Sequence, residues 1–140
     1  MQPEPSSLSS PNAKRIFIVE DNELNLKLFC DVLRAHGHDV QGVADAREAV
    51  ARATLFAPDV IILDIQMPHM SGFELIEAIR RDMILRRTPV MAVTAYAGRG
   101  DEERIRNAGA DAFVSKPIAL RPFVEAVQGL ITLAESRALV

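Results

Sequence analysis

The sequence predicts an α/β protein with a doubly wound, five-stranded parallel sheet, and three observations support this fold class. Five short apolar runs alternate with five amphipathic stretches, which is the pattern of strand–helix units in a parallel sheet. The run Val60–Leu63 is apolar at every position, as expected of a strand buried on both faces. The segments between runs and stretches are brief, so the connecting loops are expected to be short.

The five apolar runs are the predicted strands. Their bounds are Ile16–Val19, Asp39–Val43, Val60–Leu63, Val90–Val93 and Ala112–Val114. The second run is the least apolar of the five, so it is the weakest of these predictions.

The five amphipathic stretches are the predicted helices. Asn22 and Asp45 are expected to cap the first two, Gly37 to end the first, and Pro122 to lie in the first turn of the last. The predicted helices are Glu23–His36, a second between Asp45 and Pro58, Gly72–Asp82, a fourth from about Asp101 to about Gly109, and Pro122–Glu135.

These elements are expected to form one domain at residues 14–136. Residues 1–13, rich in proline and serine, are expected to be a disordered tail, and residues 137–140 a C-terminal tail. A net charge of −3 gives no basic surface for nucleic acid or an anionic membrane, and no apolar run approaches membrane-spanning length. The single cysteine, Cys30, cannot form an internal disulfide, which suits a cytoplasmic protein.

Polar side chains with useful chemistry follow four of the five predicted strands. They are Glu20 and Asp21 after the first strand, Asp64 after the third, Thr94 after the fourth and Lys116 near the end of the fifth. Because parallel strands end at one edge of the sheet, we expect these side chains to converge. Three carboxylates in one place repel one another unless cations neutralise them.

A magnesium ion together with Lys116 would balance the charge of these carboxylates, and oxygen atoms are the ligands that Mg²⁺ prefers. Thr94 would add a hydroxyl donor. A cation, an ammonium and a hydroxyl around the carboxylate of Asp64 would suit the oxygens of a phosphoryl group during its transfer.

Four motifs at these strand ends resemble the receiver domain of bacterial two-component response regulators, the CheY-like family. The motifs are Val19–Asn22, Leu63–Pro68 with Ser71 and Gly72, Val93–Ala95, and Ser115–Pro117. The resemblance extends from about residue 15 to residue 135. It implies the strand order 2-1-3-4-5 of flavodoxin-like folds.

The resemblance also implies roles for the acidic residues. Asp64 matches the aspartate that accepts a phosphoryl group from a phosphohistidine. Glu20 and Asp21 match the pair that holds Mg²⁺ beside Asp64, with the backbone carbonyl of Gln66 as a further ligand. Glu20 stands where the family more often has aspartate. Gln66 and Tyr96 match positions that gate the attacking water; both are bulky, so we expect modest autodephosphorylation.

Further residues match the family's switching and docking positions. Thr94 matches the hydroxyl that moves to meet the phosphoryl group, and Lys116 the lysine that pairs with it. Phe113 falls at the switch aromatic, where tyrosine is common, and the bond before Pro117 is expected to be cis.

The histidine donor is expected to dock at Leu24, Leu28 and the Pro117 loop. The face formed by the fourth helix, the fifth strand and the fifth helix is expected to change with phosphorylation and to meet a downstream protein target.

The segments 20–25 and 100–106 are similar to DivK-type regulators of bacterial cell-cycle signalling. The sequence ends soon after the fifth helix, so a stand-alone receiver is expected, a monomer or weak dimer rather than an enzyme. Its partners would be a histidine kinase or histidine phosphotransfer protein and a protein target, with no nucleic acid or membrane. Two outputs stay open: an allosteric regulator of kinases, or a shuttle that passes phosphate to a histidine phosphotransfer protein.

A Mg²⁺-dependent phosphatase of the haloacid dehalogenase type is the less favoured alternative. Such enzymes need a second acid two residues after the nucleophile, and Gln66 at that position cannot transfer protons. A nucleotide- or flavin-binding module of the same fold lacks support, because no phosphate-binding glycine motif follows the first strand.

Overall fold

The computed structural model describes residues 13–95 and 98–138, and within them the predicted fold is confirmed. Five parallel strands form one sheet in the order β2-β1-β3-β4-β5. Their bounds are β1 Arg15–Val19, β2 Asp39–Val43, β3 Val60–Asp64, β4 Val90–Thr94 and β5 Ala112–Ser115. All five therefore end at one edge, which brings the residues that follow them together.

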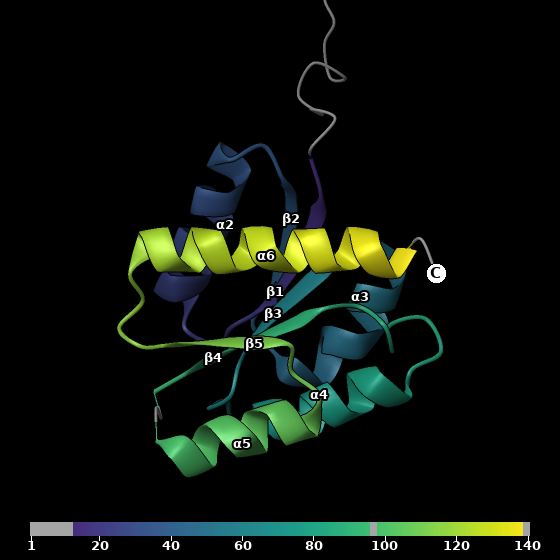
Figure 1. The fold of residues 1–140 in the computed structure, drawn as a ribbon, viewed down its shortest axis with the longest axis vertical. Helices are drawn as coiled ribbons and strands as arrows, with labels where there is room; N and C mark the ends of the chain where they lie inside the picture. The colour runs from purple at the N-terminus through teal and green to yellow at the C-terminus, as the bar shows by residue number, and fades with distance from the viewer. Residues whose placement is uncertain (1–12, 96–97, 139–140) are drawn as a thin grey trace, which may run out of the picture.

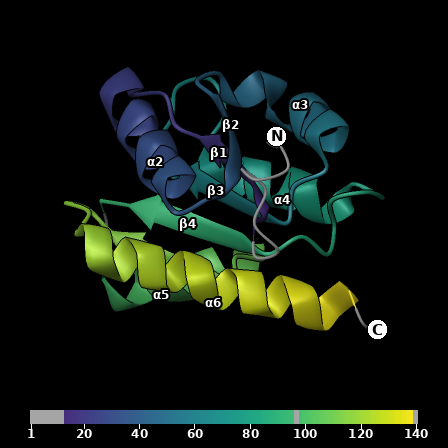
Figure 2. The same cartoon turned by 90° about the horizontal axis from the view of Figure 1, so that it is seen from above.

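Helices cover both faces of the sheet (Figure 1). Their bounds are α2 Glu23–Ala35, the 3₁₀ turn η1 Ala46–Glu48, α3 Ala49–Phe56, α4 Gly72–Arg81, α5 Arg99–Ala108 and α6 Leu120–Ala138. Figure 2 shows α2 and α3 on opposite sides of β1 and β2, and in Figure 1 β5 lies between α5 and α6. Among the described residues, no helix has the length and apolar character to cross a membrane.

Successive side chains along a strand point to opposite faces of the sheet, so the buried ones pack into two separate parts of the core. In β1, Ile16 and Ile18 pack on the side of α2 and α6, where the rings of Phe29 and Phe123 stack with centroids 4.9 Å apart. Phe17 and its alternate neighbours pack on the side of α3, α4 and α5. The sheet is thus a rigid layer that fixes the positions of the strand ends.

Several predicted helix bounds are wrong by a few residues. Asp45 caps the 3₁₀ turn η1, so that α3 begins only at Ala49. The last helix begins at Leu120 rather than Pro122 and continues to Ala138. Proline is tolerated at this point because amide groups in the first turn of a helix have no intrahelical partner.

The domain bounds stay a prediction, because the expected tails lie largely outside the described residues. Residues 1–12 and 139–140 belong to this part of the chain. Residues 137 and 138, expected in the C-terminal tail, belong to α6.

Candidate functional site

Asp64 and Lys116 form a partly buried ion pair at the carboxyl edge of the sheet. Asp64 is the last residue of β3, and its side chain is 1% exposed. Lys116, directly after β5, donates from Nζ to Asp64 Oδ2 at 2.6 Å. The peptide bond between Lys116 and Pro117 is cis, as expected. The structure therefore brings together two residues that are 52 positions apart in the sequence.

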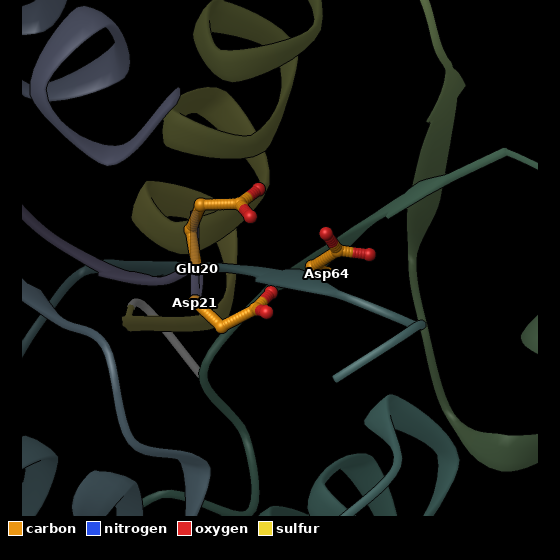
Figure 3. A group of neighbouring side chains, drawn as sticks. All are labelled: Glu20, Asp21 and Asp64. Atoms are coloured by element: carbon orange, nitrogen blue, oxygen red, sulfur yellow. The ribbon is translucent and has the colours of Figure 1, made fainter. Parts of the chain in front are cut away.

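Three carboxylates converge at the same edge (Figure 3). Glu20 and Asp21 follow β1. One carboxylate oxygen from each of Glu20, Asp21 and Asp64 lies within 4.8 Å of the other two. The backbone amide of Asn22 donates to Glu20 Oε2 at 3.1 Å, whereas the buried Oε1 of Glu20 has no hydrogen-bond partner among the described residues. A buried carboxylate oxygen without a donor is costly unless a ligand completes the site.

The electrostatics of this cluster favour an added cation. Burial raises the pKa of Glu20 to about 7, and the charge of Asp64 acts in the same direction, against the opposing effects of the Asn22 amide and Lys116. Burial by itself would lower the pKa of Lys116, but the hydrogen bond to Asp64 and the surrounding negative charges outweigh it and raise the pKa above its ordinary value. The cluster thus has more negative charge than one ammonium neutralises.

The donor set fits Mg²⁺. Three carboxylates offer hard oxygen ligands, one of them exposed, so that water can complete the coordination of a small divalent cation. The unpartnered oxygen of Glu20 is a further sign that the acidic cluster is suited to a ligand.

The turn after Asp64 is held by close packing against α4. Gly72 donates its amide to Ile65 O at 2.9 Å, and a β-carbon at this position would lie 2.5 Å from Ile65 Cα. Ser71 caps α4 by accepting from the amide of Glu74, whose side chain accepts from Ser71 N. Only glycine fits against the backbone here, so the sequence Ser71-Gly72 fixes the loop that carries Gln66.

Gln66 and Thr94 lie beside Asp64. Gln66 donates its backbone amide to Asp64 Oδ1 at 2.9 Å, and its side-chain Nε2 lies 3.4 Å from Thr94 Oγ1. Its Oε1 accepts from the backbone amide of Ala95 at 3.2 Å. Thr94 is fully buried. Tyr96, the second residue of the expected water gate, lies outside the described residues.

Phe113 in β5 is half-buried and packs against the core on the side of α3, α4 and α5. The guanidinium of Arg106 lies 5.6 Å from the centroid of its ring. The ring is therefore neither fixed in the core nor free of contacts, which is compatible with the predicted switch.

The predicted docking residues are exposed. Leu24 is 79% exposed and Leu28 45% exposed, both on α2, and Pro117 is exposed in the loop after β5. Large apolar side chains on a surface suit contact with another protein. Their role stays a prediction.

A second charged cluster, at the opposite edge of the sheet, has no counterpart in the sequence analysis. Asp111, just before β5, accepts from Arg80 Nη2 at 2.9 Å, from Arg137 Nη2 at 2.7 Å and from the backbone amide of Val90 at 2.9 Å. No local pattern indicates it, since the arginines lie 31 and 26 residues from Asp111. The side-chain bridge from Gln66 to Thr94 and Ala95 was likewise not predicted.

Comparison with protein families matches residues 16–128 to the response regulator receiver domain. Among curated proteins, the polar-differentiation response regulators DivK of Brucella anthropi and Brucella ovis are each 45% identical over 118 residues, which is 84% of this chain and 96% of the relative.

Solved structures agree with this assignment. Chemotaxis protein CheY4 of Vibrio cholerae is 28% identical with a TM-score of 0.80, covering 84% of this chain and 98% of that one. The receiver domain of a sensor histidine kinase of Pseudomonas aeruginosa, solved with a magnesium ion coordinated in its active site cleft, is 32% identical with a TM-score of 0.78. It covers 86% of this chain and 98% of its own.

Proposed function

Because the chain belongs to the response regulator receiver domain family, we propose that it is a phosphorylation switch whose phosphoryl acceptor is Asp64. Histidine kinases donate phosphoryl groups to receiver domains in two-component signalling. The similarity to DivK supports a role in cell polarity or the cell cycle, with a kinase or phosphotransfer protein upstream and a protein target downstream.

The Asp64 carboxylate is the observation that carries this proposal. It is nearly dry, it is bonded to Lys116, and it lies in a cluster with surplus negative charge. A structural carboxylate would be neutralised by its neighbours. This one instead shares a single ammonium with two further acids, which suits an acceptor that works beside a metal ion.

In the proposed reaction, a carboxylate oxygen of Asp64 forms a bond to phosphorus while the bond from phosphorus to the histidine nitrogen breaks. Lys116 holds the carboxylate in place and neutralises charge on the incoming group. Bound Mg²⁺, held by Glu20, Asp21 and Asp64, would supply positive charge to the phosphoryl oxygens. Attack of water on phosphorus later releases inorganic phosphate and restores the carboxylate.

The output is proposed to involve Thr94 and Phe113. Thr94 lies at the end of β4 beside the acceptor, and Phe113 lies in the neighbouring strand, where β4 and β5 pair. A shift of the Thr94 hydroxyl toward a phosphoryl group would change the space available to the Phe113 ring and hence the surface formed by α5, β5 and α6.

Intact mass after incubation with acetyl phosphate tests the proposal. A Mg²⁺-dependent gain of one phosphoryl group is expected on the wild type and on Asp39→Ala, which removes an exposed carboxylate at the other edge. No gain is expected on Asp64→Ala or without Mg²⁺. A folded wild type that gains nothing, from acetyl phosphate or from a phosphorylated histidine kinase, would contradict the proposal.

A further inference from the structure

The side chain of Gln66 connects the loop after β3 to the end of β4. Its backbone amide is bonded to Asp64, its Nε2 donates to Thr94 Oγ1, and its Oε1 accepts from the backbone amide of Ala95. One residue thus joins the acceptor carboxylate to both polar groups that follow the neighbouring strand.

These groups lie where a phosphoryl group on Asp64 would need donors. Asp64 pairs with Val93 in the sheet, so the two residues that follow Val93 lie beside the end of β3. A backbone amide has one hydrogen and cannot donate fully to Gln66 Oε1 and to a phosphoryl oxygen at the same time. The Ala95 amide is therefore committed to Gln66 before phosphorylation.

We infer that Gln66 is a latch that holds Thr94 and Ala95 in their unphosphorylated arrangement and must release them before they meet the phosphoryl group. This inference rests on the proposed function. The negatively charged phosphoryl oxygens form stronger hydrogen bonds than an amide oxygen, so phosphorylation displaces the latch. In the resting protein the same two bonds slow phosphorylation and favour the inactive state.

A different role for Gln66 is to shield the site from water by its bulk alone. Methionine separates the two roles, because it has nearly the length and volume of glutamine but forms neither hydrogen bond. Gln66→Met removes the latch and keeps the bulk, whereas Gln66→Ala removes both. Gln128→Met makes the same chemical change on the exposed side of α6 and serves as the control.

The first measurement is amide hydrogen exchange at Ala95, followed by NMR in the unphosphorylated protein without Mg²⁺. Loss of the Gln66 acceptor is expected to speed this exchange about two- to tenfold in Gln66→Met and Gln66→Ala, and not in Gln128→Met. This readout does not depend on phosphorylation. Unchanged exchange in Gln66→Met would overturn the inference.

The second measurement is the rate of adduct formation with acetyl phosphate and saturating Mg²⁺. The latch predicts that Gln66→Met and Gln66→Ala are phosphorylated about two- to tenfold faster than the wild type. Slower adduct formation in both variants would overturn the latch. If Gln66→Met matches the wild-type rate, or if only Gln66→Ala differs, the latch is wrong while the proposed function stands. A wild type that forms no adduct would overturn the proposed function itself.

Discussion

The two edges of the sheet carry charged clusters with opposite balances of charge. Before β5, a single carboxylate, Asp111, lies between two guanidinium groups, those of Arg80 and Arg137. At the ends of the strands, three carboxylates lie together and only one of them, Asp64, is paired with the ammonium of Lys116 among the described residues. The first cluster has an excess of positive charge next to one acid, and the second has an excess of negative charge around one base.

The clusters also differ in how completely their atoms are bonded. Both oxygens of Asp111 accept hydrogen bonds, and Arg80 further donates to the carbonyl groups of Gly109, Arg86 and Thr88. In contrast, Glu20 Oε1 is buried without a hydrogen-bond partner in the part of the chain that the structure describes. A charged cluster whose polar atoms all have hydrogen-bond partners stabilises the fold. A cluster with unpaired charge and an unpaired buried oxygen destabilises the fold until a ligand binds there.

Removing the carboxylate of Asp111, whose two oxygens accept hydrogen bonds from Arg80 and Arg137, should have the largest effect on stability. Asp111→Ala leaves two partly buried guanidinium groups without their carboxylate and the Val90 amide without its acceptor. We expect the free energy of unfolding to fall by about 2–4 kcal/mol. Urea denaturation measures it, with Asp111→Asn, which can still accept from Val90, as the milder control. A loss below about 1 kcal/mol would show that this cluster is not a structural anchor.

Removing the carboxylate of Glu20 should stabilise the protein at high pH, whereas removing that of Asp111 should destabilise it. Because its pKa is about 7 in the fold and 4.5 ordinarily, the folded protein keeps a proton that the unfolded chain releases between these values. The contribution of Glu20 to the free energy of unfolding is therefore fully present below pH 4.5. It decreases as the pH rises above 4.5 and is lost once the pH has passed about 7.

Glu20→Gln should remove this loss and stabilise the metal-free protein at pH 8 by about 1–3 kcal/mol relative to the wild type. Denaturation at pH 5 and pH 8 in the presence of a chelator measures the difference, and Glu23→Gln is the same change at an exposed position. Equal pH dependence in wild type and Glu20→Gln would contradict the strained state of this carboxylate.

Binding of Mg²⁺ should reduce the repulsion among the three carboxylates at the carboxyl edge and should not affect the Asp111 cluster. At 10 to 30 times its dissociation constant, Mg²⁺ is expected to stabilise the wild type by about 1–2 kcal/mol. Asp21→Asn should reduce this gain, because it removes one of the three carboxylates, whereas Asp111→Asn should retain it. Thermal unfolding with and without Mg²⁺ provides the measurement. An equal response in Asp21→Asn and the wild type would exclude the predicted metal site.

The smallest effect is expected for an exposed pair at the amino edge. Arg15 and Asp39 are 2.8 Å apart, but their side chains are 46% and 59% exposed. Asp39→Ala should change the free energy of unfolding by no more than about 1 kcal/mol, because water screens this pair. Asp39 and Asp111 both lie near the amino ends of the strands but differ in burial. A loss of unfolding free energy for Asp39→Ala as large as for Asp111→Ala would mean that position at this edge, rather than burial, sets the effect.

The sequence by itself determined the five strands, the approximate positions of the helices and the placement of Glu20, Asp21, Asp64, Thr94 and Lys116 at one edge. This was possible because hydrophobic periodicity is local, and because parallel strands that end in polar residues must present them together. The motifs at these strand ends then indicated the family.

Only the tertiary structure decided the contacts between side chains far apart in the chain. The pairing of Arg137 with Asp111 accompanies a last helix that runs beyond its predicted end at Glu135, and the bridge from Gln66 to Ala95 joins two loops. Such contacts depend on distances set by the packed core, and no periodicity along the chain records them. The unpartnered oxygen of Glu20 is of the same kind, because residue type alone does not say which buried atom lacks a donor.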